Sequence, residues 1–194
     1  SIGVIPLYNG EVLICKSEVT QNIDNNGQGK LNFLKYSYDS FNLIFKLTGT
    51  AKGTKQFGST GVSGSMVAML DNSVYYTAAI EGAPKAKTKL ALHKLNANTM
   101  AIEKVADLPF EAKEFVSLCM LNNTEFLVLG GNNDTSADNP KDWVRSNPFI
   151  YKFNTEDKSF TKIGDLTDVN IPKWYNQHVV LLKNGKVAIF NNSE

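Results

Sequence analysis

One pattern constrains the fold of this chain more than any other: an apolar stretch recurs at a period of 57 to 58 residues. The stretch from Leu92 to Leu108 and the stretch from Ile150 to Leu166 read almost alike, and a third copy begins at Lys35. Each copy places an Asp or Asn six residues before a large apolar residue, in the pairs Asp39/Phe45, Asn96/Ile102 and Asn154/Phe160. This spacing predicts two short strands joined by a tight turn in which the Asx side chain accepts backbone hydrogen bonds. A fixed period of this size indicates one β-rich unit repeated along the chain.

A second repeated element precedes each of these stretches and consists of an apolar strand, a two-residue turn and another apolar strand. The four turns are Asn9-Gly10, Asp71-Asn72, Asn122-Asn123 and Asn184-Gly185. Asn-Gly between aliphatic runs favours a β-hairpin because both residues tolerate a positive φ. The flanking runs predict strands over 3–7 and 11–15, 66–70 and 74–77, 116–121 and 126–129, and 178–182 and 186–190. A complete unit therefore holds four strands, and the chain contains three units followed by the first two strands of a fourth.

We therefore expect an all-β fold made of β-propeller blades, each with four antiparallel strands. The blades are expected at about 1–48, 64–109, 115–167 and 177–194, and the last has two strands only. Three and a half blades do not close a ring, and an unclosed ring leaves an apolar flank and an open sheet edge. We expect the ring to be completed either by blades missing from this segment or by oligomerisation.

The third and fourth units carry residues that go beyond the strand pattern. The third unit has Gly130-Gly131 at the end of its second strand, followed by Tyr151 and Phe160. The fourth unit has the run from Ile171 to Lys173, followed by His178. With these residues the chain resembles the kelch-repeat and galactose-oxidase-like β-propeller family, which usually has Trp where Phe160 stands. The other units lack the Gly pair, so the chain resembles a divergent member, and the resemblance implies that His178 packs near a blade boundary.

Charge and composition exclude several kinds of partner. A net charge of +1 argues against nucleic acid as a partner, and no apolar run is long enough for membrane insertion. The only Arg is Arg145, so the chain cannot build a site in which several Arg side chains clamp a carboxylate or phosphate. Cys15 and Cys119 fall in strands of non-adjacent units, which predicts two buried thiols rather than a disulfide.

The connections between strands differ greatly in length, and this difference locates the candidate binding site. Strand direction alternates, so the long connections at about 18–30, 49–64, 81–89, 132–147 and 167–176 are all expected at one end of the blades. Binding residues concentrate in long loops on a rigid scaffold. The candidate binding residues are Asp138, Asp142, Trp143 and Arg145 in one connection and Trp174 and Tyr175 in the next. Trp and Arg are frequent anchors of interfaces, although Trp143 folded back onto its blade and packing aromatics at 174–175 are equally compatible with the sequence.

Patterns for metal binding and catalysis are weak. The first long connection resembles a calcium loop from Asp24, but Asn26 and Gln28 replace acidic residues and Lys35 stands at the twelfth position. We predict no metal and no cofactor. His93 and His178 fall in different units, whereas the copper site of galactose-oxidase-like enzymes requires paired His and Tyr side chains. Kelch-type mutarotases and sialidases use several Arg side chains, and no other catalytic motif occurs, so no catalytic residue is assigned.

We expect a non-catalytic recognition scaffold that binds a protein partner through the end carrying the long connections. Two alternatives stay open: a carbohydrate-binding propeller that uses Trp143 and Trp174, and part of a kelch-like oxidase or mutarotase with catalytic residues outside this segment. The compartment is open between cytoplasmic and secreted. Three glycosylation sequons, at Asn122, Asn133 and Asn191, matter only if the protein is secreted.

Overall fold

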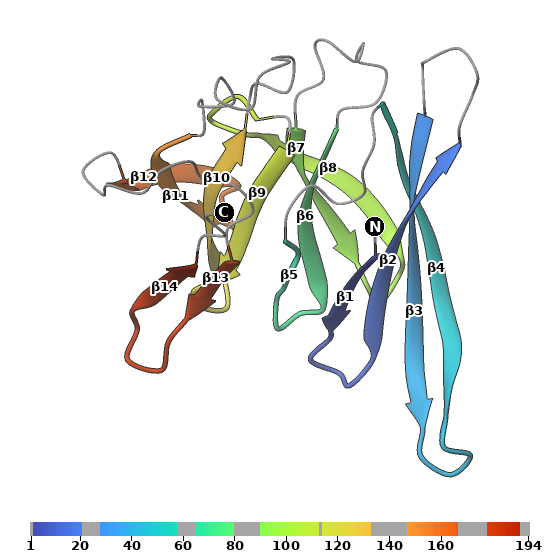
Figure 1. Ribbon diagram of the computed structural model, residues 1–194. Helices are drawn as coiled ribbons and strands as arrows, with labels where there is room; N and C mark the ends of the chain where they lie inside the picture. Colours follow the sequence, from blue (N-terminus) through green and yellow to red (C-terminus); the bar gives the residue numbers. More distant parts are fainter. Residues whose placement is uncertain are drawn as a thin grey trace.

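The computed structural model describes residues 2–20, 28–57, 65–79, 90–112, 114–132, 147–166 and 178–190. This part of the chain contains β-strands and no helix, hence no helix that could cross a membrane. The strands, labelled in Figure 1, are β1 (Ile2–Pro6), β2 (Val12–Thr20), β3 (Gln28–Asp39), β4 (Ile44–Phe57), β5 (Val67–Ala68), β6 (Ser73–Ala79), β7 (Leu90–Asn96), β8 (Ala101–Asp107), β9 (Glu114–Met120), β10 (Glu125–Asn132), β11 (Phe149–Asn154), β12 (Ser159–Asp165), β13 (His178–Leu181) and β14 (Val187–Phe190).

The strands form three four-stranded antiparallel sheets and one two-stranded sheet, each in sequence order. Sheet 1 holds β1 to β4, sheet 2 holds β5 to β8, sheet 3 holds β9 to β12, and sheet 4 holds β13 and β14. Figure 1 shows the sheets side by side like the blades of a fan. The predicted fold class is confirmed: the chain has propeller-type blades of four antiparallel strands, three complete and one with two strands.

The turn between the third and fourth strand of each sheet confirms the predicted Asx geometry. The Asp39 carboxylate accepts the backbone N–H groups of Phe41 and Asn42 at 3.0 and 3.1 Å. Asn96 and Asn154 accept the two equivalent N–H groups of their own turns. The fourth residue after each Asx has a positive φ, at Leu43, Met100 and Lys158. One local geometry therefore builds three turns of different sequence.

The turns between the first and second strands repeat a second geometry. The side chains of Asn9, Asp71, Asn122 and Asn184 each accept the backbone N–H of the residue two positions later. Gly10, Asn72 and Gly185 take a positive φ of 84°, 62° and 76°. These short turns lie at one end of the sheets, which we call the turn end (Figure 1).

The core lies between successive sheets, because each sheet presents an apolar face to both neighbours. Leu13 and Phe33 of sheet 1 pack with Val74, Tyr76 and Leu95 of sheet 2. Other side chains of sheet 2 pack with sheet 3 in a second cluster, and sheet 3 packs with sheet 4 in a third. Sheet 2 is thus buried on both faces, as the unbroken burial of residues 73–78 shows.

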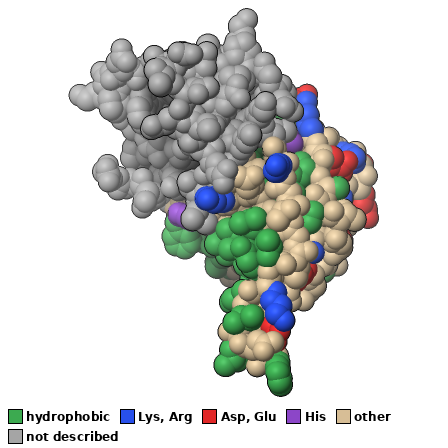
Figure 2. All heavy atoms as spheres, turned by 90° about the vertical axis from the view of Figure 1, so that its right-hand side faces the viewer, with side chains coloured by type: hydrophobic (Ala, Val, Ile, Leu, Met, Phe, Trp, Pro, Cys, Tyr) green, Lys and Arg blue, Asp and Glu red, His purple; other side chains and the backbone are tan. Residues whose placement is uncertain are grey.

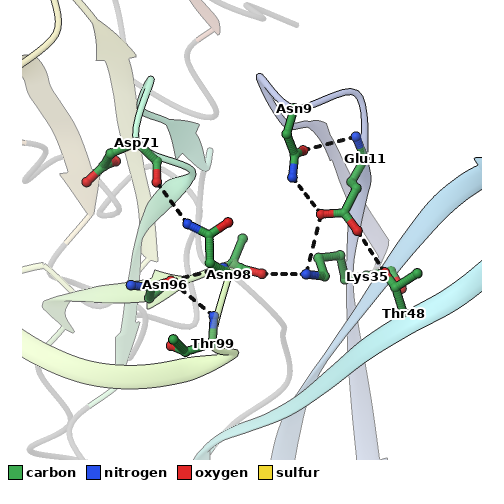
Figure 3. A network of polar contacts seen from close by, with 9 residues as sticks. Asn9, Glu11, Lys35, Thr48, Asp71, Asn96, Asn98 and Thr99 are labelled. Atoms are coloured by element: carbon green, nitrogen blue, oxygen red, sulfur yellow. Dashed lines mark hydrogen bonds and ion pairs between the residues drawn. The ribbon is translucent and has the colours of Figure 1, made fainter.

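A polar cluster links sheets 1 and 2 at the turn end (Figure 3). Lys35 is buried, with 8% of its surface exposed. Its ammonium donates to the Ala97 carbonyl of sheet 2 at 2.7 Å and lies 3.4 Å from the Glu11 carboxylate. Asn9 and Thr48 donate hydrogen bonds to the same carboxylate, at 2.7 and 2.9 Å. Burial raises the pKa of Glu11, but these hydrogen bonds and the Lys35 charge outweigh it, so the pKa lies below its ordinary value.

Three sequence predictions differ from the structure. β4 extends to Phe57 although its blade was expected to end near residue 48, and β2 and β3 leave a shorter connection than the predicted 18–30. The run 48–53 is polar and lacks alternation, but a strand can be held by backbone pairing to its neighbour without apolar side chains. β5 covers only Val67–Ala68 within the predicted 66–70. The packing role implied for His178 stays a prediction, because His178 is exposed on β13 and residues 171–177 before it lie outside the described residues.

Candidate functional site

The long connections leave the sheets at one end, opposite the turn end. In Figure 1 the strands that precede them, β2, β4, β6 and β10, all finish at the top of the sheets. We call this the loop-bearing end. The six predicted binding residues belong to the connections 133–146 and 167–177, which lie outside the described residues: Asp138, Asp142, Trp143, Arg145, Trp174 and Tyr175. The residues at which these two connections begin and end are described: Asn132, Asn147, Leu166 and His178.

The connection 133–146 starts and ends at adjacent backbone positions. The Asn147 N–H donates to the Gly131 carbonyl at 3.0 Å, and the Asn147 side chain donates to the carbonyls of Gly130 and Phe149 at 3.3 and 3.0 Å. Gly130 and Gly131 both have a positive φ, of 75° and 98°. Gly130 and Gly131 therefore turn the chain at the base of this connection.

The connection 167–177 begins beside the same base. The Leu166 N–H donates to the Pro148 carbonyl at 2.9 Å, so the last described residue of sheet 3 lies next to the residue that follows Asn147. Two connections that are separate in the sequence are thereby attached at one corner of sheet 3.

Aromatic side chains pack against one another at this corner. Tyr151 stacks on Phe110 with 5.5 Å between ring centroids and meets Phe149 edge to face at 6.4 Å. The Lys162 ammonium lies 3.5 Å from the centre of the Phe149 ring and 3.4 Å from the Asp165 carboxylate. A cation over an aromatic face and offset ring pairs both stabilise such a cluster.

A pocket of about 540 Å³ lies where the first strands of the four sheets approach one another. Each of these strands is the first of its sheet and therefore forms a sheet edge. It is lined by Ile5, Pro6, Leu7, Tyr8, Met66, Val67, Ala68, Leu118, Cys119, Met120, Val179, Val180 and Leu181. The lining is mainly apolar and contains no carboxylate, imidazole or amine.

The polar groups around this pocket are few and engaged. The Tyr8 hydroxyl donates to the Met120 sulfur at 3.4 Å, and the Ser65 hydroxyl donates to the Leu118 carbonyl at 3.1 Å. Burial raises the pKa of the Cys119 thiol, which keeps it protonated and weakly nucleophilic. The pocket is therefore suited to apolar groups or to an extended backbone rather than to acid–base chemistry.

The two cysteines and His93 serve packing. Cys15 and Cys119 are buried and form no disulfide, which confirms that prediction. His93 is 2% exposed and stacks on Tyr76, and burial lowers its pKa, so it stays neutral. Within the described ranges no group of three or more His, Cys, Asp or Glu side chains could hold a metal ion.

Sequence reasoning missed the pocket between the first strands. Each of these strands was predicted, but their convergence depends on how the sheets pack, and no local pattern encodes that distance. Tyr8 directly precedes the Asn9-Gly10 hairpin turn, and that position was the only sequence feature that could have drawn attention to it.

No protein-family model and no curated protein sequence matches this chain. Among solved structures 42 chains match it. One is YjhT, a β-propeller-like protein, with a TM-score of 0.57 and 7% sequence identity. The match covers 90% of this chain and 54% of YjhT, so the chain spans about half the length of that protein. A likeness at this identity shows the fold alone.

Proposed function

We propose that this chain is a divergent kelch-type β-propeller segment that acts as a non-catalytic recognition scaffold and binds a protein partner at its loop-bearing end. One observation carries the proposal. Hydrogen bonds from Asn147 and Leu166 attach the connections 133–146 and 167–177 at one corner of sheet 3. All six candidate binding residues therefore belong to segments that start from a common, rigid base.

The surroundings of this base favour recognition over catalysis. The Phe110, Tyr151 and Phe149 rings and the Lys162 ammonium hold the corner by packing, and their groups are engaged with one another. A rigid base under long connections is the arrangement in which binding residues are positioned at low entropic cost. Trp143 and Arg145 are of the residue types that most often anchor protein interfaces.

The test is a double substitution, Trp143→Ala with Arg145→Ala, compared with wild type in quantitative affinity capture followed by mass spectrometry. We expect a partner captured by wild type to be depleted at least tenfold, with the melting temperature nearly unchanged. The matched control is Glu156→Ala with Lys158→Ala, two exposed residues of the same sheet at the turn end, which should retain the partner.

Two outcomes would contradict the proposal. A large drop in melting temperature would show that Trp143 is a packing residue. A glycan array that gave binding dependent on Trp143 and Trp174, with no protein captured, would replace the protein partner with a carbohydrate.

A further inference from the structure

Within the described residues, seven turns share one contact, in which an Asx side chain accepts the backbone N–H of the residue two positions later. Three of these turns join the third and fourth strands of a sheet, and four join the first and second. None of the seven Asx residues is buried. Figure 2 shows one of the turns, between β3 and β4, protruding from the side of sheet 1. Because the contact closes a short ring, it holds the side-chain carbonyl carbon near the backbone nitrogen of the next residue.

An asparagine held in this way can react with its own backbone. The next backbone nitrogen attacks the side-chain carbonyl carbon, a C–N bond forms, the bond to Nδ2 breaks, and ammonia leaves with the amide proton. Water then opens the resulting succinimide to aspartate or isoaspartate. A side chain on the next residue hinders this attack, and glycine has none. Of the seven turns only Asn9-Gly10 and Asn184-Gly185 place a glycine there.

These two Asn-Gly turns differ in the residue that follows the glycine. In sheet 1 it is Glu11, whose carboxylate accepts a hydrogen bond from the Asn9 Nδ2 at 2.7 Å and also contacts Lys35. In sheet 4 it is Lys186, whose ammonium cannot accept a hydrogen bond from Asn184. A carboxylate beside Asn9 also opposes the negative charge that develops on the side-chain oxygen during attack.

The other features of the two turns are alike and do not separate the sites. In each turn the glycine N–H donates to the carbonyl three residues before it, at 3.1 Å in sheet 1 and 2.9 Å in sheet 4, and this bond has to open before attack. In both turns the backbone N–H two positions after the asparagine donates to the side-chain oxygen at 3.1 Å. A Cβ added at Gly10 or Gly185 would meet nothing within 4 Å.

We propose that Asn184 is a site of spontaneous deamidation and that the Glu11 carboxylate protects Asn9 from the same reaction. The rates at the two sites should differ by at least about tenfold, a factor that one hydrogen bond to a charged group supplies. A neighbouring sheet does not close such a turn, because Asn122 and Asn123 are exposed although sheet 3 packs on a sheet at each face. The site lies at the turn end, so this inference does not depend on the binding function proposed for the loop-bearing end.

The products fit their turns unequally. Sheet 2 has Asp71 at the position of Asn184, and its carboxylate accepts the Ser73 N–H at 2.9 Å, so aspartate suits this kind of turn. Isoaspartate lengthens the backbone by one methylene and disrupts the tight turn on which the pairing of β13 with β14 depends. At Asn9, aspartate would remove the donor to Glu11 and place two carboxylates together.

The first measurement is peptide mapping by mass spectrometry while the folded 194-residue chain is incubated at neutral pH. Asn184 should be converted at least about tenfold faster than Asn9. It should also react faster than Asn96, Asn122 and Asn154, which have the same turn contact without a following glycine and serve as internal controls. In urea, where the turns are lost, the rates at Asn9 and Asn184 should converge. Equal rates at these two sites in the folded chain, no excess over the controls, or a ratio that persists in urea would overturn the proposal.

The second measurement tests the protective carboxylate. Lys186→Glu gives sheet 4 the Asn-Gly-Glu sequence of sheet 1 and should slow conversion of Asn184 by about tenfold. Lys183→Glu makes the same charge change on the other side of Asn184 and is the matched control, whose rate should stay at the wild-type value. Circular dichroism establishes that both variants are folded. If the two substitutions slow the reaction equally, or if neither slows it, protection by a carboxylate two positions after the asparagine is refuted.

Discussion

Gly131 has a φ of 98°, and a Cβ added there would lie 2.9 Å from the Ala112 Cβ and 3.2 Å from both Phe110 and Val116. Gly185 also has a positive φ, of 76°, but a Cβ there would meet nothing within 4 Å. A side chain at Gly185 would therefore meet backbone strain alone, whereas a side chain at Gly131 would meet backbone strain and steric overlap together. Gly131 lies at the base of the candidate binding connection.

Alanine substitutions at these two glycines should have unequal costs. We expect Gly185→Ala to lower the free energy of unfolding by about 1 kcal/mol, from left-handed backbone strain alone. Gly131→Ala should lower it by about 2–4 kcal/mol, because the neighbouring side chains must also move apart. Urea unfolding of both variants measures the difference, and equal losses would show that the corner of sheet 3 relaxes freely.

At the scale of single elements, the cluster around Glu11 and Lys35 recurs in sheet 3. There Glu125 lies 2.6 Å from the Lys152 ammonium and accepts a hydrogen bond from Asn122 at 2.8 Å. The hydrogen bonds from Lys152 and Asn122 lower the pKa of Glu125. The repeat thus includes a polar contact as well as an apolar pattern. In both sheets this contact joins a carboxylate at the start of the second strand to a lysine of the third strand.

Glu11 should make the free energy of unfolding depend on pH in the acid range. Its folded pKa is below the ordinary 4.5, so its contribution is present above pH 4.5 and is lost as the pH falls through the folded value. We expect Glu11→Gln to lower the free energy of unfolding by about 1–3 kcal/mol at pH 7, since the buried Lys35 ammonium loses its carboxylate.

The gap between wild type and Glu11→Gln should narrow as the pH is lowered towards 2, as urea titrations at several pH values would show. Glu156→Gln, at an exposed carboxylate of the β11–β12 turn, is the control and should track wild type at every pH. A gap that stays constant with pH would mean that the Glu11 carboxylate does not stabilise the fold.

At the scale of the whole molecule, sheet 2 connects the two larger cores. Val74 and Leu95 belong to the cluster shared with sheet 1, whereas Tyr75 and Leu92 belong to the cluster shared with sheet 3. Loss of packing in sheet 2 should therefore weaken both neighbours together.

Leu95→Ala tests this coupling. Leu95 is 0% exposed, and we expect a loss of about 2–5 kcal/mol in the free energy of unfolding, in a single transition seen alike by circular dichroism and tyrosine fluorescence. Leu182→Ala, at a 41% exposed leucine beside β13, should cost under about 1 kcal/mol. Separate transitions in the Leu95 variant would show that the sheets unfold independently.

Much of the fold could be predicted from particular residues. Asp39, Asn96 and Asn154 marked three turns, and the Asn-Gly and related pairs marked four more, because Asx side chains and positive φ angles act within a few residues. The candidate site could be predicted only as a set of long connections at one end. The residues that attach them, Asn147 and Leu166, act through contacts with Gly131 and Pro148 that no local pattern reveals.

The sequence by itself determined the strands, their grouping in fours and the places of the turns, since these depend on side-chain alternation and on turn chemistry between near neighbours. Only the tertiary structure decided how far β4 runs, which faces are covered and where the first strands enclose a pocket. Those features arise from backbone pairing and from packing between sheets that are distant in the sequence. Val74 and Leu95 of sheet 2 are 0% exposed, for example, whereas Leu47 of sheet 1 is 53% exposed.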